Sequence, residues 1–217
     1  MSIPLSTCKK KANGQSKRME IIMVHGIWDT GRIFRRMASA LERHGHKCYR
    51  PSLSPANGAN GLEDLARKLD RYINENVGED SPLVIIGFSM GTIISRVYLQ
   101  KLGGHERVTH FFSISGPHHG TLTAHFWPGK GSRDMRFKSR LLRSLNKNTN
   151  VLAGIEIHSY RTPFDLMILP SKSSQWAIAE NHVIPAAMHP LMVIQPAIFN
   201  HIAGVLATEE TDQSRTG

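Results

Sequence analysis

The chain has little cysteine and lacks any long apolar run. Its two cysteines, Cys8 and Cys48, have a spacing that matches neither a zinc-binding nor a redox motif, so a disulfide is not expected. No stretch approaches the roughly 18 consecutive apolar residues of a membrane-spanning helix, and the N-terminal stretch has no apolar run of signal-peptide length. These features lead us to expect a cytoplasmic protein without a transmembrane segment.

Acidic residues are scarce in two parts of the chain. The formal net charge is +10, to which residues 1–19 contribute +5 and residues 130–147 contribute +6, so the remainder is nearly neutral. A basic chain raises nucleic acid as a partner, but no recognisable binding motif supports one here, and none is expected. We expect residues 1–18 to form a disordered basic tail and residues 208–217 a flexible C-terminal tail.

The sequence also lacks internal repeats and low-complexity segments outside the basic tail. Short apolar runs instead alternate with amphipathic helical patterns, which predicts one α/β domain over residues 19–207 with a mostly parallel sheet. Strands are expected within residues 19–24, 46–51, 82–88, 107–115, 154–160 and 181–185. Asn60 is expected to cap a helix that carries Glu63 three residues later, and Pro196 is expected to begin the last helix.

The stretch GFSMG places Ser89 between two glycines, after a buried run and before an amphipathic helix. This context predicts a nucleophile elbow, in which the glycines keep Cβ atoms out of a tight crossing. The alternative is an ordinary turn between a strand and a helix. An oxyanion would need two backbone N–H donors, for which we expect Met90 and, from the stretch VHGIWD, Ile27, with Trp28 as the alternative. His25 in the same stretch is expected to be structural.

Three motifs, VHGIWDTG, GFSMG and SGPHHGT, occur in an order that resembles α/β-hydrolase serine esterases, particularly small bacterial lipases. The resemblance covers about residues 19–206. It implies an ester hydrolase with a serine, an acid and a histidine in that chain order, and it implies no metal or redox cofactor. Members usually begin with extra antiparallel strands, which this sequence lacks. We therefore expect an α/β-hydrolase fold with a reduced sheet of about six strands and helices on both faces.

The general base must be chosen from twelve histidines. The family's chain order excludes the histidines before Ser89, and His201 falls inside the last expected helix. His189, which follows the final expected strand on a loop, is our candidate. The alternative is a loop histidine with no proton to move. No carboxylate or cysteine pattern supports a metal at His118 and His119, so no metal site is predicted.

Asp165 is the candidate acid. It lies in a loop after the strand expected at 154–160 and upstream of His189. A carboxylate there can accept the imidazole N–H, fix the ring tautomer and stabilise the imidazolium. An aspartate that merely caps a turn is the alternative.

Residues 121–150 form a cap-like insertion outside the alternation. Phe137, Leu141 and Leu145 recur every four residues and the opposite face is basic, which predicts an amphipathic helix. Such a helix can contact an anionic membrane surface or cover an acyl pocket. Our hypothesis is that it gates an apolar substrate and senses anionic lipid. The simpler alternative is a short helix that buries one stripe and leaves its charges in solvent.

Aromatic side chains indicate the substrate class. We expect Trp28, His118, Phe126 and Trp127 to line the substrate pocket, which favours acyl chains over charged substrates. The predicted function is a serine hydrolase that cleaves carboxylic esters through an acyl-serine intermediate. Thioesterase, phospholipase and acyltransferase activities use the same residues and stay open. A non-catalytic binding protein of the same fold is the alternative of another class.

Overall fold

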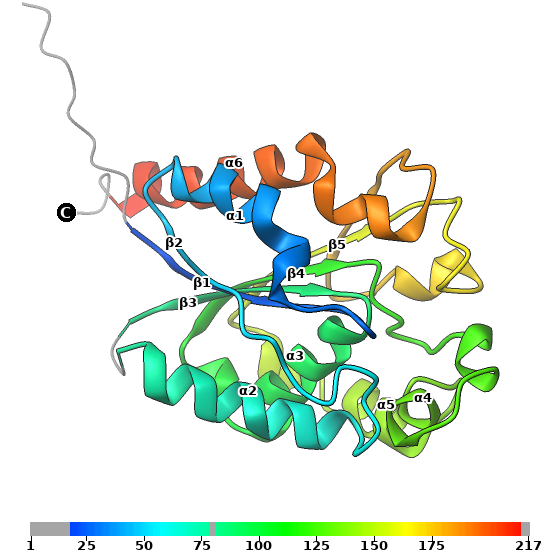
Figure 1. Ribbon diagram of the computed structural model, residues 1–217. Helices are drawn as coiled ribbons and strands as arrows, with labels where there is room; N and C mark the ends of the chain where they lie inside the picture. Colours follow the sequence, from blue (N-terminus) through cyan, green and yellow to red (C-terminus); the bar gives the residue numbers. More distant parts are fainter. Residues whose placement is uncertain (1–17, 79–80, 214–217) are drawn as a thin grey trace, which may run out of the picture.

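The computed structural model describes residues 18–78 and 81–213 and has three layers, with a sheet between two layers of helices (Figure 1). The predicted tail, with Cys8, lies outside the described residues apart from Arg18. Six parallel strands form the sheet in the order β2-β1-β3-β4-β5-β6. The strands are β1 (Glu20–Val24), β2 (Lys47–Tyr49), β3 (Leu83–Phe88), β4 (Val108–Ile114), β5 (Glu156–Arg161) and β6 (Glu180–Val183). The predicted parallel sheet of about six strands is confirmed.

Helices cover both faces of the sheet. The α-helices are α1 (Arg35–Glu42), α2 (Leu62–Asn76), α3 (Met90–Lys101), α4 (Lys130–Asp134), α5 (Arg140–Lys147) and α6 (Pro196–Gln213). The 3-10 helices are η1 (Gly31–Phe34), η2 (Gly104–Glu106), η3 (Leu122–His125), η4 (Asn150–Leu152), η5 (Ser171–Ser174) and η6 (His189–Ile194). Helices α1 and α6 lie on one face, and α2, α3 and α5 lie on the other (Figure 1).

The handedness of the connections explains which helix covers which face. Connections between parallel strands are almost always right-handed. The chain moves from β1 outward to β2 through α1, then reverses and moves through α2 and α3 toward β4, so α1 is on the opposite face from α2 and α3. The connections that leave the carboxyl ends of the neighbouring strands β1 and β3 therefore go to opposite faces of the sheet. In open α/β sheets, ligands bind at such a switch point, next to the carboxyl ends of the strands.

Burial confirms the predicted central strand. Every residue of β3 is buried, as expected for a strand that is covered on both faces. Helix α3, which follows it, is buried from Met90 through Gln100. This helix therefore packs between the sheet and the second layer of helices, and its first turn has a fixed position relative to β1 and β3.

The predicted cap at Asn60 is wrong. Helix α2 begins one residue later, at Leu62, and Gly61 occupies the capping position with φ of 94°. The Leu62 N–H donates instead to Asp134 Oδ2 at 2.9 Å, from the inserted segment. A carboxylate from α4 thus accepts a backbone N–H at the start of α2. In most helices a side chain at the capping position accepts such an N–H.

The continuous amphipathic helix predicted across Phe137, Leu141 and Leu145 is also wrong. Lys138 has φ of 55°, which interrupts helical geometry, and α5 begins only after Ser139, whose Oγ accepts from the Leu142 N–H at 3.1 Å. Both leucines of the predicted stripe that lie in α5 are buried in the core. The apolar face of α5 is therefore unavailable to a membrane, and the structure matches the simpler alternative of a helix that buries one stripe.

The last helix begins at Pro196, as predicted, and runs to Gln213, so the expected boundary at residue 207 falls inside it. Along the described ranges, no helix combines the length and apolarity needed to cross a bilayer.

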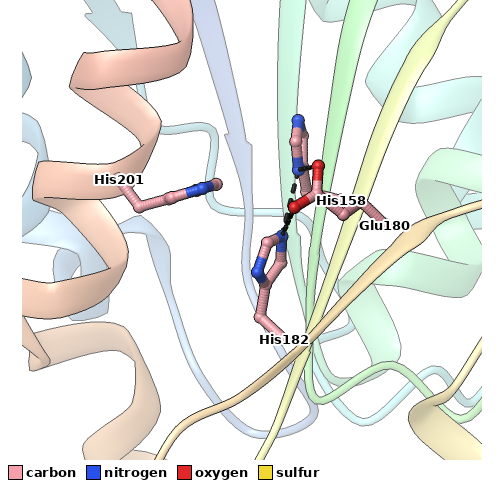
Figure 2. Close-up of side chains that lie close together, drawn as sticks. All are labelled: His158, Glu180, His182 and His201. Atoms are coloured by element: carbon pink, nitrogen blue, oxygen red, sulfur yellow. Dashed lines mark hydrogen bonds and ion pairs between the residues drawn. The ribbon is translucent and has the colours of Figure 1, made fainter.

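A group of polar side chains lies at the β6 edge of the sheet. His158 on β5, His182 on β6 and His201 on α6 come together there with Glu180, in what we call the histidine cluster (Figure 2). Tyr160 lies beside it and bonds His201 through its hydroxyl at 2.9 Å. This arrangement brings together three elements that are far apart in the chain.

Candidate functional site

Ser89 occupies a strained turn between β3 and α3. Its φ of 53° and ψ of −121° lie outside the ordinary regions for a residue with a side chain, and such strain costs about 1–3 kcal/mol. The Ser89 N–H donates to the Ile114 carbonyl at 2.8 Å, which ties the turn to the end of β4. The residue lies at the carboxyl end of β3 and is 5% exposed.

The two glycines of GFSMG are required by close backbone packing. A Cβ at Gly91 would lie 2.0 Å from the Val24 carbonyl oxygen, and one at Gly87 would lie 2.8 Å from the Thr92 Cα. Neither position can hold a side chain without movement of the backbone. The glycines therefore let α3 begin directly against β1, which fixes the direction of the turn that carries Ser89.

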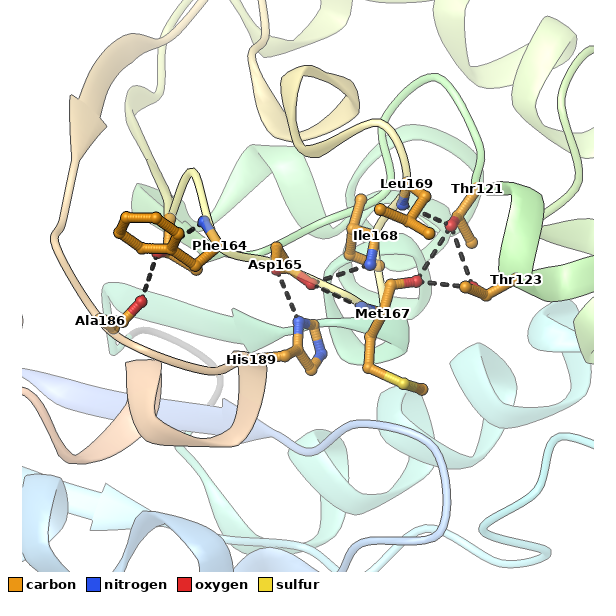
Figure 3. Close-up of polar contacts among 10 residues, drawn as sticks. Thr121, Thr123, Phe164, Asp165, Met167, Ile168, Leu169, Ala186 and His189 are labelled. Atoms are coloured by element: carbon orange, nitrogen blue, oxygen red, sulfur yellow. Dashed lines mark hydrogen bonds and ion pairs between the residues drawn. The ribbon is translucent and has the colours of Figure 1, made fainter.

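His189 and Asp165 form a hydrogen-bonded pair (Figure 3). The distance between His189 Nδ1 and Asp165 Oδ2 is 2.8 Å, and both side chains are buried. Asp165 Oδ1 accepts the N–H groups of Met167 and Ile168 at 2.9 and 2.8 Å. These bonds hold the carboxylate in one orientation, and the carboxylate in turn makes Nδ1 the protonated nitrogen of the ring. His189 Nε2 is then free to accept a proton.

The loops that carry this pair are tied to each other. Thr162 Oγ1 donates to the Ala186 carbonyl at 2.6 Å, which joins the loop after β5 to the loop after β6 (Figure 3). The same oxygen accepts the Phe164 N–H at 3.3 Å. The His189 ring packs on Phe88, the residue before Ser89, with 4.8 Å between ring centroids. The structure thus places Ser89, Asp165 and His189 at one edge of the sheet, although no hydrogen bond within the described ranges joins the Ser89 hydroxyl to His189.

A second carboxylate, Asp29, lies in the same region and was not foreseen as a site residue. A Cβ built on Gly26 would lie 3.2 Å from both Asp29 Oδ2 and Ser89 Cβ. Burial raises the pKa of Asp29 above its ordinary value, while His25 and His189 oppose that rise. The sequence feature that could have indicated Asp29 is its position in the VHGIWD stretch, on the loop after β1.

Backbone hydrogen bonds around VHGIWD differ between Ile27 and Trp28, the two candidates for the second oxyanion donor. The Trp28 N–H is already used, because it donates to the Ala56 carbonyl at 2.9 Å. In the described part of the chain, the N–H groups of Ile27 and Met90 have no hydrogen-bond acceptor. His25 accepts the Leu53 N–H on Nε2 at 2.9 Å, and its Nδ1 lies 2.8 Å from the Gly26 carbonyl, so its role is structural, as expected.

His118, which was predicted to line the substrate pocket, lies in the buried interior. It is fully buried, and its Nε2 lies 2.9 Å from Ser113 Oγ while its ring stacks on Trp176. Burial, with a smaller contribution from Arg96, holds the pKa of His118 well below its ordinary value. Arg96 Nη2 donates to Asn146 Oδ1 at 2.8 Å, so this buried network joins α3 to α5. The SGPHHGT motif therefore anchors the inserted segment.

The three aromatic residues that were predicted to line the pocket are exposed. Trp28 follows β1 and is 51% exposed, and Trp127 of the inserted segment is 41% exposed. Their rings meet edge to face with 4.6 Å between centroids. Phe126 is 80% exposed. Large exposed apolar groups of this kind mark places where an apolar partner can be bound.

Comparison with known proteins identifies relatives of this architecture. The family model of the alpha/beta hydrolase fold matches residues 21–150, which is more than half of the chain and includes Ser89. The match ends before Asp165 and His189. No curated protein matches the sequence.

Solved structures share the fold at low sequence identity. The mature form of a lipase from Bacillus licheniformis has 14% identity and a TM-score of 0.69, with 88% of this chain and 92% of that chain covered. Lipase B from Aspergillus fumigatus has 14% identity and a TM-score of 0.72, with 90% of this chain and 54% of that chain covered. Polyneuridine aldehyde esterase has 16% identity and a TM-score of 0.61, with 88% and 98% covered.

The contacts of Gly91 predict a large effect on stability. Gly91→Ala should destabilise the protein by several kcal/mol or prevent folding, since the new Cβ would overlap the Val24 carbonyl. Gly204→Ala in α6 is the matched control. It meets no atom within 4 Å and should raise the free energy of unfolding by about 0.5–1 kcal/mol. Urea denaturation measures both, and equal stability of the two variants would contradict the close packing of α3 on β1.

Proposed function

Because the chain belongs to the α/β-hydrolase fold family, we propose that it is a serine hydrolase that cleaves carboxylic esters through an acyl-serine intermediate. The observation that carries the proposal is the buried hydrogen bond between Asp165 and His189, at the same edge of the sheet as the strained turn of Ser89. A nucleophile, a base and a group that orients the base are the parts that acyl transfer by a serine requires.

In the proposed reaction, Ser89 Oγ attacks the ester carbonyl carbon and His189 Nε2 takes the hydroxyl proton. The carbonyl oxygen becomes an oxyanion and accepts the N–H groups of Ile27 and Met90. As the bond from carbon to the leaving oxygen breaks, His189 returns the proton to the alcohol. Water then repeats the sequence on the acyl-serine, which releases the acid and restores Ser89. Asp165 holds His189 and stabilises its positive charge throughout.

Asp165 is proposed as the acid in preference to Asp29. Only Asp165 bonds the Nδ1 of His189, and its other oxygen is held by two backbone N–H groups. Burial raises the pKa of Asp29, the charge of His189 opposes that rise, and no hydrogen bond in the described part of the chain joins the two side chains.

Two observations support an ester with an apolar acyl group. Trp28, Phe126 and Trp127 offer exposed aromatic surface on the loop after β1 and on the inserted segment, and the rings of Trp28 and Trp127 are in contact. Structural neighbours of this chain include two lipases and an esterase. The charged face of the inserted segment gives no comparable support for lipid sensing, because the leucines of α5 pack inward.

The proposed nucleophile can be tested by removing its hydroxyl. Ser89→Ala should reduce hydrolysis of p-nitrophenyl butyrate to the background rate, since the proposed nucleophile that forms the acyl-enzyme is then missing. Ser39→Ala, an exposed serine of α1, is the matched control and should keep full activity. Circular dichroism should show both variants folded. Substantial turnover by folded Ser89→Ala would exclude Ser89 as the nucleophile.

The second prediction concerns the acid. Asp165→Asn should reduce kcat about 10³–10⁴-fold with little change in KM, because an amide N–H facing His189 Nδ1 forces the wrong ring tautomer. Asp29→Asn, the comparison variant, should reduce kcat less than about 10-fold, as expected for a charge that touches neither ring nitrogen. If Asp29→Asn were the inactive variant and Asp165→Asn the active one, the assignment of the acid would be reversed.

The third prediction concerns the acyl group. Trp127→Ala should lower kcat/KM for p-nitrophenyl palmitate about 10-fold or more and change that for the acetate less than about 3-fold, because only a long chain reaches this wall. Ile178→Ala, an exposed apolar residue before β6, is the control. An equal loss on both esters would mean that Trp127 does not contact the acyl chain.

A further inference from the structure

The histidine cluster gathers four groups that can bind a metal ion. His158, Glu180, His182 and His201 each offer one ligand atom, and these atoms all lie within 4.8 Å of one another. In Figure 2 the ring of His201 points from α6 toward the two histidines of the neighbouring strands. The proposed ester chemistry uses none of these four side chains.

The distances among three of the groups are already close to those of a zinc site. His158 Nδ1 lies 3.1 Å from His182 Nε2 and 3.5 Å from Glu180 Oε2. His182 Nε2 lies 3.7 Å from Glu180 Oε1. In a tetrahedral site with Zn–N bonds of about 2.0–2.1 Å, neighbouring ligand atoms are about 3.3 Å apart. Because all four ligand atoms lie within 4.8 Å of one another, an inward movement of His201 would complete the set of four ligands.

The opposite side of two rings is held by a second partner. His158 Nε2 lies 2.8 Å from Glu156 Oε1, and His201 Nδ1 lies 2.9 Å from the Tyr160 hydroxyl. These bonds leave Nδ1 of His158 and Nε2 of His201 to face the centre of the cluster. Metal-binding histidines usually bond a carboxylate or other oxygen through their second nitrogen in this way, which fixes the ring and its tautomer.

The charge of the cluster suits a divalent cation. The carboxylates of Glu180 and Glu156 would offset the charge of a divalent cation.

We propose that His158, Glu180, His182 and His201 form a structural site for Zn²⁺ that joins β5, β6 and α6. Three nitrogens and one carboxylate oxygen leave no open position, which is typical of structural rather than catalytic zinc. The joined positions span residues 158–201, and this segment contains both Asp165 and His189. The metal would therefore restrain the two loops that carry the pair.

Zinc titration of untagged protein, freed of metal with EDTA, tests the site by calorimetry. We expect one equivalent of Zn²⁺ to bind, a rise in Tm with Zn²⁺ concentration, and no response to Mg²⁺ or Ca²⁺. Co²⁺ should bind with the intense visible absorption of a tetrahedral complex. These readouts do not use ester hydrolysis, so their outcome is separate from that of the proposed function.

Variants decide whether the cluster binds the ion. His182→Ala should weaken Zn²⁺ at least 100-fold, and Glu180→Gln, on a side chain that is 66% exposed, should weaken it about 10-fold or more without unfolding the protein. His105→Ala on η2, the matched control, should bind as the parent does. Absence of Zn²⁺ binding by the parent, or an affinity unchanged in both cluster variants, would overturn the proposal. An equal loss in His105→Ala would overturn it as well.

Discussion

The close approach of α3 to the end of β1 is the contact on which the candidate site depends. Gly91 has no Cβ, so the first turn of α3 lies directly against the Val24 carbonyl. This contact brings the N–H of Met90 and the loop that contains Ile27 to the same edge of the sheet. It also forces Ser89 into the strained turn, and the bond from Ser89 to Ile114 holds that turn in place. Without the close packing, the strain at Ser89 and the approach of Met90 to the loop that contains Ile27 would be lost.

The other half of the candidate site depends on β5 and β6. Asp165 and His189 follow these two neighbouring strands, and the contact from Thr162 to Ala186 joins their loops. The carboxylate is held by backbone N–H groups, so the orientation of the imidazole does not rely on a mobile side chain. The proposed zinc site would add a second restraint farther along the same strands and on α6. Strands β1 and β3 therefore position Ser89, and strands β5 and β6 position Asp165 and His189.

The sequence predicts the parts of the fold that depend on local pattern. The apolar run of β3 indicates a central strand, and the two glycines beside Ser89 indicate a turn with close packing. Asp165 and His189 could be chosen from chain order, but only the structure reveals the 2.8 Å bond between them. Their pairing with Ser89 in catalysis stays a prediction.

The features that the sequence does not reveal arise from long-range contacts. Asp134 replaces Asn60 at the start of α2 because the inserted segment folds back on a helix far from it in the chain. His118 looks like a pocket residue in SGPHHGT, yet Trp176 covers it. The histidine cluster forms only once β5, β6 and α6 are neighbours, and its residues follow no metal-binding spacing.

The most direct measurement of the central claim is covalent labelling by a fluorophosphonate, followed by peptide mass spectrometry. Such reagents phosphonylate a serine that is activated by a base and surrounded by oxyanion donors. The account predicts one label per chain, on the peptide that contains Ser89, and no label after heat denaturation. A folded protein that takes no label, or takes it on another residue, would contradict the account.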